Sequence, residues 1–162
     1  MRIAFFVAIM LVIVGVSGCC KRQNLAAAAM LSPSSYVMSA TLTKSGDVTS
    51  FSAISDQYVT AVKSDSTCVI TGNDTSGTIV VSNFTFKIVG FYGVGSYYID
   101  SASLNHGDYE TNGLIYTQTS FAQGTITING VVGKNIYGVF QGTLANGSVV
   151  ANGKFTALGK GF

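Results

Sequence analysis

Charge is scarce in this sequence. Only 10% of its 162 residues are Asp, Glu, Lys or Arg, whereas 48% are hydrophobic. Such a chain is not intrinsically disordered, because disorder requires high charge and low hydrophobicity. Its nine basic residues are scattered along the chain, whereas proteins that bind nucleic acid concentrate theirs on one face. The composition therefore predicts one folded domain and argues against nucleic acid as a partner.

Metal ligands are also scarce, since the sequence has a single histidine and three cysteines. His106 precedes Asp108 and Glu110 at alternating positions. Zinc sites usually add a second His or a Cys, and calcium loops need more oxygen ligands. We therefore expect residues 105–110 to be a polar surface loop that holds no metal. The alternative is a periplasmic hydrolase that uses His106 with nearby acids.

No cofactor motif is present. Gly93-Val94-Gly95 matches part of a phosphate-binding loop, but such a loop binds phosphate at the start of a helix. The residues that follow, 97–100, are typical of a strand. We therefore expect neither a nucleotide nor any other cofactor.

No apolar run is as long as the roughly 20 residues that a membrane-spanning helix needs. The longest, residues 3–16, follows Arg2 and has the length of a secretory signal. Its end, Val16-Ser17-Gly18-Cys19, resembles the lipobox of bacterial lipoproteins. The resemblance implies a signal peptide at residues 1–18 that is cleaved before Cys19, and lipid, including palmitate, on Cys19.

Residues 19–35 are expected to form a lipidated tether between the membrane and the domain. Lys21 and Arg22 would favour anionic headgroups. Cys20 occupies the position at which an Asp resembles an inner-membrane retention signal. We therefore predict anchoring to the outer membrane, facing the periplasm.

From residue 36 to residue 162 the sequence predicts strands. Residues 78–89 alternate between two faces with a period of two, as a half-buried antiparallel strand does, and form the longest predicted strand. The other predicted strands are residues 36–42, 48–54, 56–62, 67–71, 97–100, 124–128, 136–144 and 149–155. Predicted turns are residues 44–47, 63–66, 72–77, 129–134 and the Asn146-Gly147 pair. No helical pattern follows residue 35. We predict an all-β domain, either a single antiparallel β-sandwich or a flattened barrel. We expect Cys68 to be buried as a free thiol, and the alternative is a disulfide between Cys20 and Cys68.

Three segments of the last third carry a family resemblance. Residues 124–128 (GTITI), 137–142 (YGVFQG) and 150–155 (VANGKF) resemble strands of small β-rich lipoproteins of Bacteroidota. The resemblance implies an antiparallel β-sandwich or flattened barrel. That group has no agreed activity, so it supplies no functional residues.

Five aromatic residues near the Gly93–Gly95 turn are the candidate binding site: Phe91, Tyr92, Tyr97, Tyr98 and Tyr109. Tyr97 and Tyr98 would point to opposite faces of a strand, so at most one of them joins the core. Exposed tyrosines would suit stacking on a glycan or packing on an envelope protein. The alternative is that these rings fill one end of the core. The sequence thus favours a non-enzymatic ligand-binding, protein-binding or structural lipoprotein.

Overall fold

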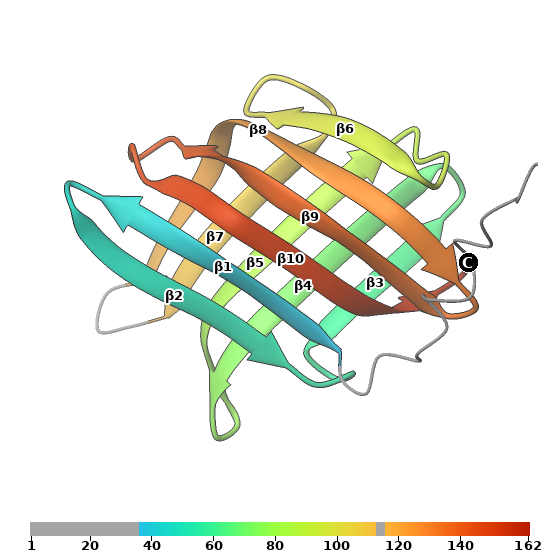
Figure 1. Ribbon diagram of the computed structural model, residues 1–162, viewed down its shortest axis with the longest axis horizontal. Coiled ribbons are helices and arrows are strands. Elements are labelled where there is room, and N and C mark those ends of the chain that lie inside the picture. The colour runs from blue at the N-terminus through green and yellow to red at the C-terminus, as the bar shows by residue number, and fades with distance from the viewer. Residues whose placement is uncertain (1–35, 113–115) are drawn as a thin grey trace, which may run out of the picture. The chain divides into compact units, whose positions relative to one another are not determined.

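The computed structural model describes residues 36–112 and 116–162 (Figure 1). The predicted signal peptide at residues 1–18, the tether at residues 19–35 and Cys19 itself lie outside the described residues. Every regular element in the described part is a β-strand, which confirms the all-β class. No helix there is long and apolar enough to cross a membrane. The strands are β1 (Val37–Lys44), β2 (Asp47–Ile54), β3 (Val59–Ser64), β4 (Thr67–Ser76), β5 (Ile79–Val89), β6 (Gly95–Asp100), β7 (His106–Asn112), β8 (Tyr116–Val132), β9 (Asn135–Leu144) and β10 (Val149–Lys160).

Seven strands form a closed barrel, in the order β3, β4, β5, β7, β8, β9 and β10. Its neighbours are antiparallel except β10 and β3, which run parallel along residues 158–160 and 60–62. The prediction of a wholly antiparallel domain is therefore wrong at this one pair. The chain connections explain this pair. β2 and β10 run in the same direction, because each is antiparallel to β1. β3 follows β2 after residues 55–58 and keeps that direction, so it runs parallel to β10.

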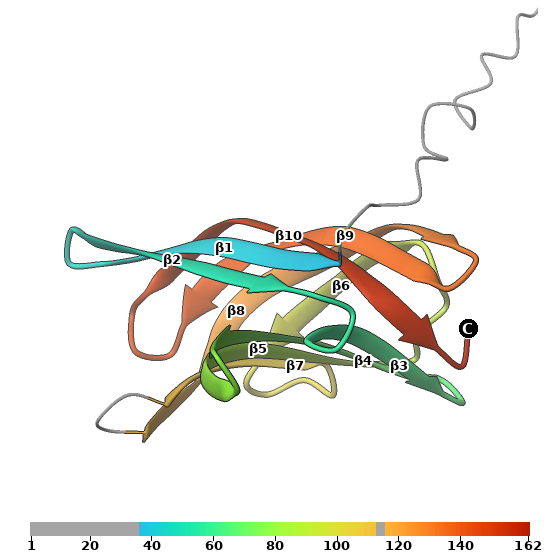
Figure 2. The same ribbon diagram turned by 90° about the horizontal axis from the view of Figure 1, so that it is seen from below.

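The barrel and its extra strands form two facing layers (Figure 2). One contains β1, β2, β9 and β10, and the other contains β3, β4, β5 and β7. β8 belongs to both, because residues 116–120 pair with β7 and residues 121–132 pair with β9. β6 pairs with residues 123–128 of β8. β1 and β2 extend the sheet beyond β10, so β2 and β6 are the two ends of the strand order.

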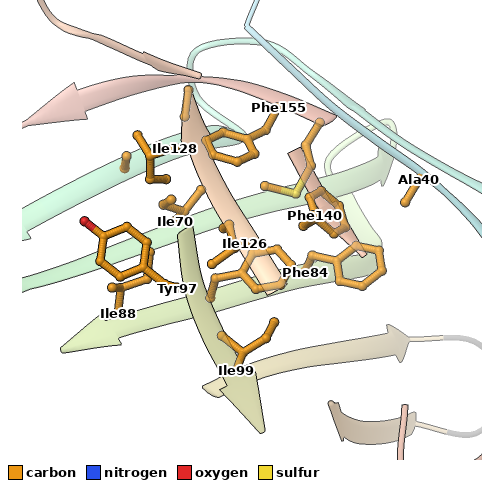
Figure 3. Close-up of a cluster of buried hydrophobic side chains, with 14 of the residues drawn as sticks. Ala40, Ile70, Phe84, Ile88, Tyr97, Ile99, Ile126, Ile128, Phe140 and Phe155 are labelled. Atoms are coloured by element: carbon orange, nitrogen blue, oxygen red, sulfur yellow. The ribbon is translucent and has the colours of Figure 1, made fainter. Parts of the chain in front are cut away.

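Phenylalanine side chains fill the space between the layers. Phe84, Phe86, Phe121 and Phe140 are all buried. The ring of Phe140 lies 4.8 Å from that of Phe86 and 5.3 Å from that of Phe84, measured between centroids. Isoleucines surround this cluster (Figure 3). The interior is packed with side chains, so a binding surface must lie on the outside or at the ends of the barrel.

Two segments that looked like turns belong to strands. Residues 72–76 are the end of β4, because Gly72 lies under Met38, whose sulfur would be 2.6 Å from a Cβ at that position. Residues 129–132 are likewise the end of β8, and the ring of Tyr137 covers Gly130 there. These glycines allow close packing and do not turn the chain. β8 is accordingly the longest strand, at 17 residues, in place of the predicted 78–89.

Other predicted features agree with the structure. β5 spans most of the predicted strand 78–89, and the turns at 44–47 and Asn146-Gly147 connect β1 to β2 and β9 to β10. Cys68 carries a free thiol and is buried. Burial raises the pKa of this thiol to about 12.

Candidate binding site

The five predicted aromatic residues do not form one surface. Phe91 and Tyr97 are buried in the core, and their rings stack with centroids 5.7 Å apart. The Tyr97 hydroxyl donates a hydrogen bond to the Gly93 carbonyl (2.8 Å) and accepts one from the Tyr92 N–H (3.1 Å). Burial raises the pKa of Tyr97 above the ordinary tyrosine value. These two rings therefore hold the loop before β6 against the barrel.

Tyr109 also serves the core in part. It is half-buried, and its ring lies 4.6 Å from that of Phe84. Burial raises the pKa of its hydroxyl. Its exposed side borders a groove of about 440 Å³ between the β1–β2 hairpin and β7, where Lys44, Asp47 and Thr111 are also found.

Tyr92 and Tyr98 are the exposed members, at 71% and 56% of their surface. The ring of Tyr92 lies 4.8 Å from that of Tyr97 and covers the side of Gly95 on which a Cβ would be. Tyr92 is therefore on the same side of β6 as the buried Tyr97. Tyr98 follows Tyr97 on the strand and points to the opposite, outer side. The two exposed rings thus belong to different parts of the surface.

A shallow hollow of about 230 Å³ adjoins Tyr98 on the outer face of β6, β8 and β9. Its side chains are uncharged: Tyr98, Gln123, Thr125, Gln141 and Thr143. The backbone of Gly124 and Gly142 completes the lining. We call this set of seven residues the Tyr98 face.

Strand register brings the members of the Tyr98 face together. Tyr98 pairs with Thr125, which pairs on its other side with Gln141. Gln123 pairs with Thr143 in the next outward-facing row. A tyrosine ring therefore lies at one end of a row of hydroxyl and amide groups, which can both donate and accept hydrogen bonds.

His106, Asp108 and Glu110 lie on strand β7, so the prediction of a loop at residues 105–110 is wrong. The segment is a strand because β7 pairs with β5 on one side and β8 on the other. Gly107 faces the core beside the rings of Phe86 and Phe121. The alternating residues point outward, as polar side chains on a two-sided sheet do.

The outward acids of β7 are engaged by their neighbours. Ser120 donates a hydrogen bond to Asp108 (2.6 Å), and the Asn83 amide donates one to Glu110 (2.7 Å). His106 pairs in register with Lys87. No group of three His, Cys, Asp or Glu residues within the described part of the chain could hold a metal ion. These contacts give β7 a polar outer surface.

The sequence pattern indicated Tyr98 but not the four polar side chains around it. Thr125 falls in the GTITI segment and Gln141 in YGVFQG, where the alternation shows that both point away from the core. Their proximity depends on the register of β8 and β9, which the alternation does not specify. Knowledge of which residues of β8 and β9 pair with each other would have identified the row of Tyr98, Thr125 and Gln141.

Comparison with known proteins gives no relative. No protein-family model matches the sequence, and no curated protein or solved structure is a significant match.

Proposed function

We propose that this chain is a lipid-anchored envelope protein that binds a neutral glycan on the Tyr98 face. The anchor is lipid on Cys19, and the domain faces the periplasm from the outer membrane. This part of the proposal depends on the lipobox-like residues and on the resemblance to small β-rich lipoproteins of Bacteroidota. The proposal includes no enzymatic activity and no cofactor.

The composition of the Tyr98 face supports this choice of ligand. A sugar ring presents C–H groups on its faces and hydroxyl groups at its rim. An exposed tyrosine offers an apolar ring face together with a hydroxyl group. Gln and Thr side chains beside it can donate hydrogen bonds to sugar hydroxyls and accept hydrogen bonds from them. An anionic ligand would call for Lys or Arg, and the hollow has neither.

The packed interior supports a surface site as well. Barrels that carry a ligand internally need an open cavity, whereas the phenylalanine cluster occupies this one. A shallow outer site of about 230 Å³ suits a short stretch of a longer polysaccharide. Envelope polysaccharides present many identical units, so a weak site can still retain them.

The binding proposal is tested with a panel of immobilised neutral oligosaccharides of glucose, galactose, mannose and N-acetylglucosamine. The compact unit Pro33–Phe162, which contains the whole described core, is the soluble probe. We expect binding to at least one oligosaccharide and at least a tenfold weaker affinity for Tyr98→Ala, with an unchanged melting temperature. Tyr92→Ala is the matched control, because Tyr92 is more exposed but lies outside the Tyr98 face.

Two results would contradict the binding proposal. One is equal loss of binding in Tyr92→Ala and Tyr98→Ala, which would indicate a nonspecific contribution of exposed aromatic rings. The other is release of reducing sugar from a bound oligosaccharide that disappears in His106→Ala, which would favour the hydrolase.

The anchoring proposal has a separate test. Cys19→Ser in the full chain should abolish palmitate labelling and move the protein from the detergent phase to the aqueous phase. Cys20→Ser is the control and should label as the wild type does. Continued labelling of the Cys19→Ser variant would show that the lipid is elsewhere.

A further inference from the structure

The free edge of strand β2 is open to another strand. Among the described residues β2 pairs only with β1, in an unbroken register from Lys44–Asp47 to Val37–Ile54. The two-residue turn Ser45-Gly46 makes Lys44 and Asp47 the hydrogen-bonded closing pair of this hairpin. Hydrogen-bonded and non-hydrogen-bonded pairs then alternate along the strand.

This alternation identifies the backbone groups at the free edge. Asp47, Thr49, Phe51 and Ala53 direct their N–H and C=O groups toward β1. Val48, Ser50, Ser52 and Ile54 therefore direct theirs outward, away from the sheet. Their side chains share the outer face, where all four are exposed.

The opposite end of the strand order is protected. At β6 the loop that follows the strand folds back on it. The Asn105 side-chain amide donates a hydrogen bond to the Tyr98 carbonyl, and the Asp100 N–H donates one to the Asn105 carbonyl. Natural edge strands are otherwise blunted by Lys, Pro or a bulge. β2 has none of these, and its one charged residue, Asp47, is at its start.

The exposed side chains of β2 are complementary to those of a second copy. Val48 and Ile54 are 66% and 63% exposed, and two serines lie between them. If two β2 strands run antiparallel with Phe51 at the centre, Val48 lies opposite Ile54 of the other copy. Ser50 then lies opposite Ser52. Each of these pairs joins residues whose backbone groups point outward, so the register satisfies both strands.

Other registers fit less well. A register shifted by one residue places the outward-pointing N–H and C=O groups of one copy opposite residues of the other copy whose N–H and C=O groups already bind β1. A register shifted by two residues keeps the hydrogen bonds between the copies. In one direction it places Val48 opposite Ser52, and in the other it places Ile54 opposite Ser50. The Phe51-centred register alone makes both apolar contacts, and cross-strand side-chain pairs of this kind stabilise a sheet.

We propose that two copies of this chain associate through their β2 edges, in the antiparallel register centred on Phe51. The two-fold axis is normal to the sheet, and the same edge is used by both copies. The β4–β5 hairpin projects past β2 in Figure 1 but belongs to the other layer (Figure 2), so it leaves the edge open in the plane of the sheet. Because an axis normal to a sheet preserves its faces, both Tyr98 faces are presented on the same side. The proposed dimer does not depend on the proposed glycan site. Only the presentation of two glycan sites on one side of the dimer rests on the proposed function.

Sedimentation equilibrium of the unit Pro33–Phe162 over a concentration series tests the proposal. We expect the wild type to approach twice the monomer mass. Val48→Lys combined with Ile54→Lys should raise the dissociation constant at least tenfold. Val139→Lys is the matched control, because Val139 is an exposed valine of β9 away from the edge, and it should dimerise as the wild type does.

Ser52→Pro tests the backbone pairing separately from the side chains. It removes an N–H that points away from β1, so every bond within the β1–β2 hairpin remains and the circular dichroism spectrum should not change. This variant should be monomeric. A wild type that stays monomeric at millimolar concentration would overturn the proposal. So would a folded Ser52→Pro variant that still dimerises, because the dimer would then use another surface.

Discussion

The inner and outer faces of β6, β8 and β9 carry side chains of opposite character. Adjacent rows of the same three strands show this, because the register pairs corresponding positions across them. The inward row is Tyr97, Ile126 and Phe140, and all three are buried. The outward row is Tyr98, Thr125 and Gln141.

Packing accounts for the inward row but leaves the outward row unexplained. Each inward side chain removes apolar surface from water, and this burial stabilises the fold. The outward side chains have no such constraint, and solubility alone would be served by Lys and Glu. Instead the Tyr98 face has a tyrosine among neutral amides and hydroxyls, and Asp100 adjoins it in the row of Gln123 and Thr143. The inner face therefore specifies the barrel, and the outer face is where we propose that a ligand binds.

The largest effect should come from the inner side of the barrel. Phe84→Ala removes a ring that contacts Phe86, Phe121 and Phe140. The free energy of unfolding in urea should fall by about 3–5 kcal/mol. Gln141→Ala on the outer face should change it by less than about 0.5 kcal/mol. Similar losses in both variants would remove the distinction between the faces.

Gly138→Ala should give the next largest loss. A Cβ at Gly138 would meet the Thr127 carbonyl oxygen and the ring of Phe155, and a backbone atom cannot move aside cheaply. We expect the free energy of unfolding to fall by about 1–3 kcal/mol. Val139→Ala, at the next and outward-facing position, is the control and should cost less. Thermal unfolding of the two variants decides the matter, and a Gly138→Ala variant as stable as wild type would refute the close packing.

The raised pKa of Cys68 predicts a loss of stability at alkaline pH. Its pKa is about 12 in the folded state against an ordinary value of 9.0. Above pH 9 the unfolded chain releases the thiol proton and the folded chain keeps it. The stability of the fold is therefore unaffected by this thiol below pH 9, and it falls as pH rises from 9 toward 12.

The slope from Cys68 should be at most about 1.4 kcal/mol per pH unit. Urea unfolding at pH 8, 9 and 10 should show a shallower decline for Cys68→Ala than for the wild type. Thr125→Ala, on the outer face, should keep the wild-type slope. Equal slopes for all three proteins would mean that Cys68 titrates normally.

A further difference should separate the two adjacent tyrosines. Tyr97→Phe removes the hydroxyl that bonds Gly93 and Tyr92, and each such bond contributes about 1 kcal/mol. Tyr98→Phe removes an exposed hydroxyl and should leave stability unchanged. Matched melting curves test this pair. A greater loss in Tyr98→Phe would reverse the assignment of inner and outer residues.

Alternation along the chain predicted most strands and the faces of their residues. It placed Tyr97 and Tyr98 on opposite sides and indicated the strand that is β5. It failed where glycine or polar residues occupy strands. Gly72 and Gly130 suggested turns, yet each leaves room for the side chain of another strand, Met38 or Tyr137. Such long-range contacts are not visible in local composition.

The candidate site was only partly predictable for the same reason. Five aromatics within 19 residues suggested one surface, but the barrel directs Phe91 and Tyr97 inward and separates Tyr92 from Tyr98. The polar partners of Tyr98 come from β8 and β9, which are distant in sequence. β7 was missed because its outward residues are polar and because Gly107, Tyr109 and Thr111 on its other face do not form an apolar row. Closure through the parallel pair of β10 and β3 also depends on three-dimensional packing.

We propose that the outer face of β6, β8 and β9 binds a neutral glycan. Backbone amide chemical shifts of the ¹⁵N-labelled unit Pro33–Phe162, titrated with the neutral oligosaccharide panel, test it most directly. We predict saturable shifts at residues 98, 123–125 and 141–143, and their loss in Tyr98→Ala. Shifts confined to β7 around His106 or to the groove beside Tyr109, or no shifts with any oligosaccharide, would contradict the claim.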